Sequence, residues 1–142
     1  MVQKSTAANL HRSSAGLRVL LADDYAPWRS KVRSFLQRKT EWKIVFEACD
    51  GLEAVQMAVK LQPDVALLDV TMPGLNGIEA ARRICQLSPN SKIIMLTLNR
   101  DEDLKAAALE AGALAYVLKI EMTTVLIHAV EAALRTHNSL IS

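Results

Sequence analysis

The amino-acid sequence predicts an α/β protein with a doubly wound, five-stranded parallel sheet that is covered by helices on both faces. Five short apolar runs alternate with longer segments in which apolar residues recur every three or four positions. The first pattern is typical of buried strands and the second of amphipathic helices. Because a helix lies in every connection, consecutive strands are expected to run parallel with right-handed crossovers. The carboxyl ends of all five strands then lie along one edge.

Five strands are predicted from the apolar runs. They occupy residues 19–22, 44–46, 65–68, 93–96 and 114–118. The runs at 65–68 and 93–96 show no alternation of polar and apolar residues, which indicates strands that are buried on both faces.

Five helices are predicted between and after these strands. Pro27 suits a first helical turn, Asp50 and Glu53 have the spacing of a capping box, and Asn76 starts a second one. Gly112 is the expected C-cap of the fourth, Ala-rich helix. The apolar positions with helical period are Trp28, Val32, Phe35 and Leu36; Leu52, Val55 and Val59; Ile78, Ala81 and Cys85; Leu104, Ala107, Ala108 and Ala111; Leu126, Ala129, Val130 and Ala133.

Length and composition fit one cytoplasmic domain. The 142 residues are 51% hydrophobic and 23% charged, so a core can form without disulfides. No apolar run is long and uncharged enough to cross a bilayer. Cys49 and Cys85 stand far apart in apolar surroundings and are expected to be buried thiols of a reducing compartment.

The net charge of +2 does not indicate a nucleic-acid surface. Lys4 and Arg12 lie in residues 1–16, which are rich in small polar residues and are expected to form a disordered leader. The remainder carries 15 basic and 15 acidic residues. A basic run at 29–39 is interpreted as a mostly solvated helix face, with a partner surface as the alternative.

Polar side chains end four of the five strands. Asp23 and Asp24 follow the first strand, Asp69 the third, Thr97 the fourth and Lys119 the fifth. Two carboxylates about 4 Å apart repel by roughly 4 kcal/mol at an effective dielectric of about 20, and a divalent cation relieves that repulsion. Mg²⁺ suits such oxygen ligands together with phosphate oxygens. The set favours phosphoryl transfer, with Asp69 as the nucleophile.

These motifs, in this order, resemble the receiver domain of bacterial two-component response regulators of the NarL/FixJ type. The resemblance covers about residues 17–134 and includes the paired acids, an Asp-x-x-Met-Pro-Gly loop that begins at Asp69, and Leu-Thr-Leu-Asn around Thr97. Tyr-Val-Leu-Lys, which ends at Lys119, completes the match. The resemblance implies a flavodoxin-like fold with strand order 2-1-3-4-5.

The resemblance also implies the role of each site residue. Asp69 accepts a phosphoryl group from a sensor histidine kinase, Thr97 and Lys119 bind phosphoryl oxygens, and Tyr116 changes rotamer as part of the switch. No other enzyme activity is implied beyond slow autodephosphorylation. Most receivers have proline where this chain has Ile120, so a cis bond is not expected there. The implied Mg²⁺ ligands are Asp23, Asp24, Asp69 and the backbone carbonyl of Thr71.

The expected organisation is a leader at 1–16, a receiver at 17–136 and a tail at 137–142. In NarL/FixJ-type regulators such a tail leads into a helix-turn-helix domain, so we favour a receiver taken from a longer transcription factor over a stand-alone one. DNA binding is expected only through that missing domain. The expected partners are the kinase and a second copy docked through the first and fifth helices, without a membrane.

Other readings share parts of this pattern. A flavodoxin needs Ser, Thr and Gly donors where Asp23 and Asp24 would repel phosphate. A haloacid-dehalogenase-like phosphatase places a second Asp where this chain has Thr71. The open alternative is a degenerate receiver that acts as a phosphorylation-independent protein-interaction module.

Several single residues also carry expectations. Trp28 and Trp42 are expected to pack beside the first helix, and Leu98 stands where many receivers carry a smaller residue. Three histidines share no spacing with other ligands and are expected on the surface or at helix ends, namely His11, His128 and His137.

Overall fold

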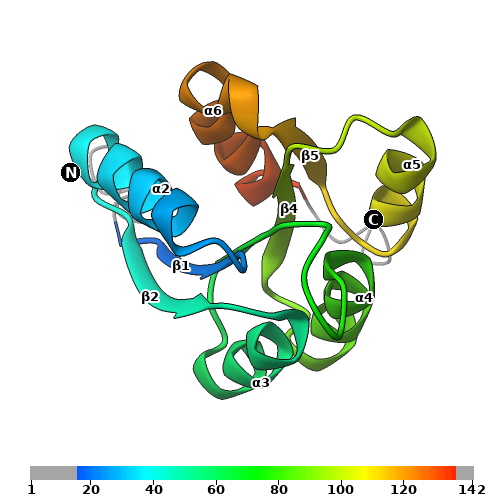
Figure 1. Ribbon diagram of the computed structural model, residues 1–142. Coiled ribbons are helices and arrows are strands. Elements are labelled where there is room, and N and C mark those ends of the chain that lie inside the picture. The colour runs from blue at the N-terminus through cyan, green and yellow to red at the C-terminus, as the bar shows by residue number, and fades with distance from the viewer. Residues whose placement is uncertain (1–15, 137–142) are drawn as a thin grey trace.

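The described residues, 16–136 of the computed structural model, contain one sheet of five parallel strands in the order β2-β1-β3-β4-β5 (Figure 1). This confirms the predicted fold and strand order. The predicted leader up to residue 15 and the tail at 137–142 lie outside the described residues, as do His11 and His137. The strands are β1 (Arg18–Ala22), β2 (Lys43–Ala48), β3 (Val65–Leu68), β4 (Lys92–Thr97) and β5 (Ala115–Leu118).

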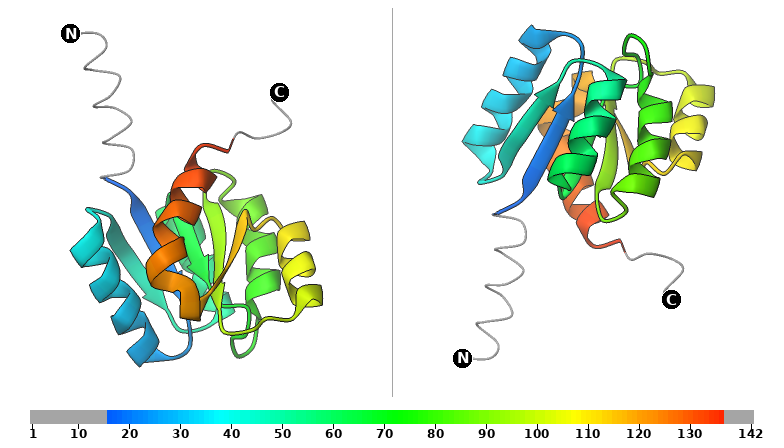
Figure 2. Two further views of the ribbon diagram at one scale, coloured as in Figure 1. Left: turned by 90° about the horizontal axis from the view of Figure 1, so that it is seen from above. Right: turned by 90° about the horizontal axis from the view of Figure 1, so that it is seen from below.

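Helices cover both faces of the sheet, as Figures 1 and 2 show. Two of them, α2 and α6, pack on one face, and α3, α4 and α5 pack on the other. None of the described helices is long and apolar enough to span a membrane. The helices are α2 (Ala26–Lys39), α3 (Gly51–Leu61), α4 (Gly77–Leu87), α5 (Glu102–Glu110) and α6 (Met122–Leu134), with a 3₁₀ turn, η1 (Lys119–Glu121), before the last.

The sheet separates two apolar cores. Along β1, Val19 and Leu21 face the core under α2 and α6, whereas Leu20 and Ala22 face the core under α3, α4 and α5. This is the two-residue period of a strand that is buried on both faces. All four residues of β3 are buried for the same reason.

Side-chain caps fix the starts of three helices. The Asp50 carboxylate accepts a hydrogen bond from Glu53 N at 2.8 Å, and Asn76 Oδ1 accepts one from Glu79 N at 2.9 Å, which confirms both predicted caps. A third cap, Asp101 on α5, was not predicted. Gly112 ends α5 as predicted: it directly follows the C-cap residue Ala111, has a φ of +119°, and donates its N–H to Leu109 O at 3.1 Å.

Two predictions about buried residues are wrong. Cys49 is an exposed free thiol, and Cys85 is only partly buried. On α3, Leu52 and Val59 are 51% and 44% exposed. The helix buries the predicted Val55 together with Gly51, Ala54 and Ala58, and at its start a Cβ on Gly51 would overlap the Leu75 carbonyl.

The remaining predictions for single residues can be compared directly. His128 is exposed, as expected. Trp42 is buried at 6% exposure and Trp28 is partly buried, and both pack against the core under α2 and α6.

Candidate functional site

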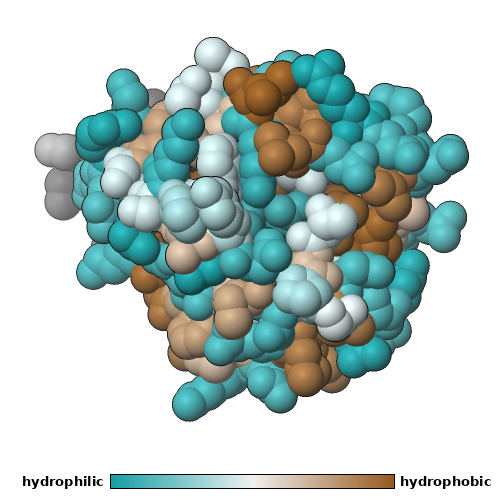
Figure 3. Space-filling model, in the orientation of Figure 1, coloured by the Kyte–Doolittle hydropathy of each residue, from teal (hydrophilic) through white to brown (hydrophobic). Residues whose placement is uncertain are grey.

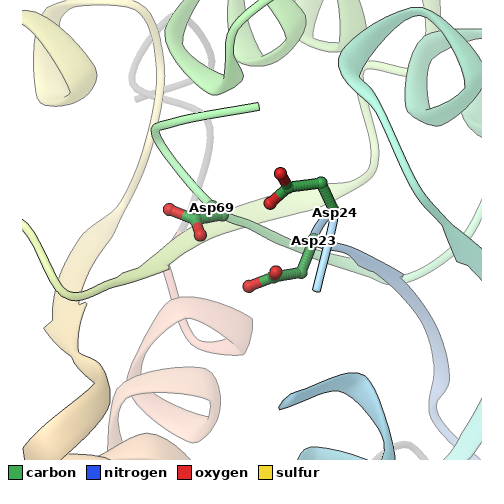
Figure 4. Close-up of side chains that lie close together, drawn as sticks. All are labelled: Asp23, Asp24 and Asp69. Atoms are coloured by element: carbon green, nitrogen blue, oxygen red, sulfur yellow. The ribbon is translucent and has the colours of Figure 1, made fainter. Parts of the chain in front are cut away.

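The backbone brings the acidic side chains to one edge of the sheet. Asp23 N donates to Ala48 O and Asp69 N donates to Ala22 O, both at 3.0 Å, so the sheet's hydrogen bonding continues past the strand ends. One carboxylate oxygen from each of Asp23, Asp24 and Asp69 lies within 4.8 Å of the others (Figure 4). Asp23 and Asp69 are buried and Asp24 is exposed, so the cluster is open to solvent on one side.

Lys119 neutralises part of this negative charge. Its Nζ lies 2.6 Å from Asp23 Oδ2 and 3.0 Å from Asp69 Oδ2, and its side chain is 8% exposed. Burial alone would lower the pKa of the Lys119 ammonium, but the hydrogen bonds and charges of the two carboxylates outweigh it, and the pKa is raised. The Lys119 ammonium is therefore held in its charged form between Asp23, which follows β1, and Asp69, which follows β3.

Asp23 is the most constrained of the acids. Its Oδ1 accepts a hydrogen bond from Tyr25 N at 2.8 Å. Its buried Oδ2 makes the ion pair with Lys119 but accepts no well-directed hydrogen bond. Burial raises the pKa of Asp23, although Lys119 and the Tyr25 N–H act in the opposite direction. A carboxylate that has lost hydration in this way gains from a second cation.

The acid cluster fits a hard divalent cation. All its donors are carboxylate oxygens, the ligand type that Mg²⁺ prefers. The buried Asp23 Oδ2, whose described partner is the Lys119 ammonium, and the exposed Asp24 provide a buried and an open side for such an ion. The residues present therefore match the expected metal chemistry.

The loop after β3 is built closely around Asp69. Asp69 Oδ1 accepts a hydrogen bond from Thr71 N at 3.2 Å, and Gly77 N donates to Val70 O at 2.8 Å. A Cβ on Gly77 would overlap the Asp69 carbonyl, so the start of α4 approaches the Asp69 backbone as only glycine allows. The role of Gly77 was not predicted, although it directly follows the helix cap at Asn76.

The loop after β4 forms the other side of the site. Thr97 is fully buried at the end of β4, and its Oγ1 accepts a hydrogen bond from Asn99 N at 3.3 Å. The Tyr116 hydroxyl donates to Asn99 O at 2.8 Å. Leu98, which lies between Thr97 and Asn99 in the sequence, is 69% exposed. Thr97 and Tyr116, the two predicted switch residues, thus both make a hydrogen bond with the backbone of Asn99 in this loop.

One site residue, Arg29, and its partner Glu47 were missed in the sequence. Arg29 donates from Nη1 to Asp23 O at 2.6 Å, and its Nε lies 3.2 Å from Glu47 Oε1. Arg33 Nε lies 2.6 Å from Glu47 Oε2. The basic run is mostly solvated, as predicted, with Lys31, Arg38 and Lys39 exposed and the Arg33 side chain 41% exposed. Arg29 is the exception, because its side chain is only 17% exposed and packs against Asp23 and Glu47.

Trp28 also contributes to the site. Its ring centroid lies 5.0 Å from Lys119 Nζ, within the range of a cation–π contact. The peptide bond after Lys119 is trans, as the replacement of proline by Ile120 predicted.

Comparison with known proteins gives consistent matches. The family model of the response regulator receiver domain matches residues 19–131. The transcriptional regulatory protein LiaR of Bacillus subtilis is 42% identical over 117 residues, which cover 82% of this chain and 56% of LiaR. The chain spans about half the length of several curated transcriptional regulators that it matches.

Solved structures share the fold. A two-component response regulator of the LuxR family from Aurantimonas has a TM-score of 0.79 at 34% identity, over 84% of this chain and 85% of that one. The isolated receiver domain of RcsB from Salmonella enterica, solved with a phosphomimetic, has a TM-score of 0.75 at 28% identity, over 82% and 87% of the two chains. This chain belongs to the response regulator receiver domain family.

Proposed function

We propose that this receiver domain takes a phosphoryl group from a sensor histidine kinase onto Asp69, with Mg²⁺ in the acid cluster. The observation that carries the proposal is the Lys119 ammonium, which lies between Asp23 and Asp69, two acids of the cluster that also includes the exposed Asp24. A nucleophilic carboxylate next to a fixed cation and further acids has the charge pattern that phosphoryl transfer requires.

In the proposed reaction, an Asp69 carboxylate oxygen attacks phosphorus while the bond from phosphorus to the kinase imidazole nitrogen breaks. The electron pair of that bond leaves with the imidazole, and an acyl phosphate forms on Asp69. Bound Mg²⁺ would offset charge on the phosphoryl oxygens. It would be held by Asp23, Asp24, Asp69 and the Thr71 carbonyl.

The residues around Asp69 have separate roles in this proposal. Lys119 is already 3.0 Å from Asp69 Oδ2 and binds a phosphoryl oxygen after transfer. Thr97 donates its hydroxyl to another oxygen, which draws the loop after β4 inward. Tyr116 follows because its hydroxyl is bonded to Asn99 in that loop. The domain then shifts between two populations that differ along 98–118.

The output of the switch rests on the comparisons and on the surface. LiaR is a transcriptional regulatory protein, and we propose that this chain is the cytoplasmic receiver part of such a regulator, with DNA bound only through a separate C-terminal helix-turn-helix domain. A second copy would dock through α2 and α6. Figure 3 shows hydrophobic residues gathered over the start of α6, where Ile120 and Val125 are 66% and 36% exposed.

Intact mass spectrometry tests the proposal. Incubation with acetyl phosphate and Mg²⁺ is expected to add one phosphoryl group to the wild type and none to Asp69→Asn. The same adduct on the Asn variant would place the acceptor elsewhere. A wild type that never gains the adduct, from acetyl phosphate or from a kinase, would favour the phosphorylation-independent interaction module.

Metal binding is tested separately. Mg²⁺ is expected to shift the backbone amide resonances of residues 23–25 in the wild type, and the shifts should disappear in the double variant Asp24→Ala, Asp69→Ala. Binding that survives in the double variant would exclude this site as the magnesium site.

A further inference from the structure

We propose that Arg29 is a positioning residue for the metal site, because its guanidinium fixes the turn that aims the Asp23 and Asp24 carboxylates. This inference rests on the proposed function, since it concerns how the same acid cluster is held ready for Mg²⁺. It assigns a task to a residue that touches neither the phosphoryl acceptor nor the cation.

The first step is the geometry of the turn after β1. Asp23 N donates to Ala48 O, and Asp23 Oδ1 accepts from Tyr25 N. The remaining polar group of this residue's backbone, the Asp23 carbonyl, accepts from Arg29 Nη1 at 2.6 Å. Arg29 therefore closes the set of contacts that orient Asp23, and it does so from the first turns of α2.

The second step is how Arg29 itself is held. Its Nε pairs with Glu47 Oε1 at 3.2 Å, and the two side chains are 17% and 21% exposed. Glu47 lies on β2 opposite Leu21 of β1. The guanidinium thus connects three elements, the end of β1, the start of α2 and β2, and its fork is suited to two directed bonds at once.

The third step is the distribution of charge. Among the described residues, no ion pair joins Arg29 to Asp23, Asp24 or Asp69, whereas Lys119 pairs with two of these acids. Because Arg29 pairs with Glu47 and with none of the acids of the cluster, the guanidinium supports the turn without competing with a metal ion for their carboxylates. Partners of this kind commonly change metal affinity by about 10- to 100-fold when removed.

The test is a Mg²⁺ titration of the metal-free protein, followed by the amide resonances of residues 23–25, with thermal unfolding measured in parallel. Arg29→Met keeps the apolar part of the side chain and removes the guanidinium group. We expect this variant to bind Mg²⁺ about tenfold more weakly. Exchange of the Tyr25 amide in the absence of metal should also become faster. Arg29→Lys retains one donor and is expected to restore part of the affinity.

Arg33→Met is the matched control. It removes the other ion pair of Glu47, on a side chain that is 41% exposed, and leaves the bond to Asp23 in place. We expect Mg²⁺ affinity within about twofold of the wild type.

The possible outcomes separate the two proposals. Wild-type affinity in Arg29→Met, or an equal loss in Arg33→Met and Arg29→Met, would overturn the role of Arg29 alone. If Arg29→Met does not fold, wild-type affinity and wild-type Tyr25 exchange in Glu47→Leu would overturn it, since that variant removes the acceptor that holds the guanidinium. A wild type that shows no response to Mg²⁺ would overturn the metal site in the proposed function as well.

Discussion

The two sides of the acid cluster are held in different ways. On the anchored flank, which comprises Asp23, Arg29, Glu47 and Lys119, buried or partly buried charges are tied by ion pairs between 2.6 and 3.2 Å. On the switch flank, residues 98–118, Thr97 and Tyr116 hold the loop after β4 by neutral hydrogen bonds to the Asn99 backbone, and the Asp101 carboxylate accepts only from the N–H groups of the helix that it caps. None of the described ion pairs involves this flank. The helix that follows, α5, buries only Ala108.

This difference indicates where the domain can respond. Charged networks in a partly buried setting are costly to rearrange, because each broken pair leaves a charge without a partner. Neutral bonds and a sparsely buried helix cost less to change, and such regions have lower local stability. We therefore expect phosphorylation to leave the anchored flank in place and to shift the switch flank.

The largest effect is expected from the cation that bridges the acids. Lys119→Met leaves the negative charge of Asp23 and Asp69 without its fixed counter-charge, and we expect phosphoryl transfer from acetyl phosphate to slow by about a hundredfold. Intact mass against time measures the rate. Lys105→Met removes an exposed lysine of α5 and should leave the rate unchanged. A Lys119 variant that transfers at the wild-type rate would remove this residue from the reaction.

The next effect concerns the coupling of the two flanks. Thr97→Ala should still accept a phosphoryl group at Asp69, because it leaves the carboxylates and Lys119 intact, but most of the change in amide exchange along 98–118 should be lost. Ser91→Ala is the control, since it removes another buried hydroxyl beside the same strand, one bonded to Pro63 O. A full response in Thr97→Ala would show that another group couples the site to the loop.

A smaller effect is expected at the mouth of the site. Leu98 follows Thr97 and is 69% exposed, so its side chain can hinder the water that attacks the phosphoryl group without supporting the core. Shortening it to Ala should speed dephosphorylation by about threefold, which corresponds to ~0.7 kcal/mol in the barrier. Leu87→Ala, at a residue that is 52% exposed at the far end of α4, should not change the rate. An unchanged or slower rate in Leu98→Ala would refute the steric explanation.

The smallest effect is expected in the pH dependence of thermal stability, which tests the ion pairs of the anchored flank. Hydrogen bonding to Arg33, with support from Arg29, lowers the pKa of Glu47 below its ordinary value of 4.5, although burial opposes this. Glu47 therefore stabilises the fold above pH 4.5, and this contribution is lost as the pH falls through the lowered pKa. The midpoint of thermal unfolding should differ most between wild type and Glu47→Gln near pH 7 and least near pH 3. A difference that does not depend on pH would mean that the ion pairs are not its source.

Much of the fold was predictable from local patterns. The five apolar runs and the caps at Asp50 and Asn76 have their causes within a few residues of chain. The acids, Thr97 and Lys119 were predictable as a group, because parallel strands place their carboxyl ends on one edge.

The parts that were missed depend on contacts across the sheet. Arg29 and Glu47 are 18 residues apart, and nothing in either segment alone shows that they meet. The 51% exposure of Leu52 likewise depends on which side of α3 the neighbouring elements cover. Periodicity identifies an apolar face but does not show which part of it the neighbouring elements cover.

The most direct measurement is amide hydrogen exchange of the wild type before and after phosphorylation at Asp69, in the same Mg²⁺ buffer. The comparison of the two flanks predicts that protection changes along 98–118, in the loop after β4, α5 and β5, and stays constant along 18–48, where β1, α2 and β2 lie. Equal changes in both segments, or a change confined to 18–48, would contradict it.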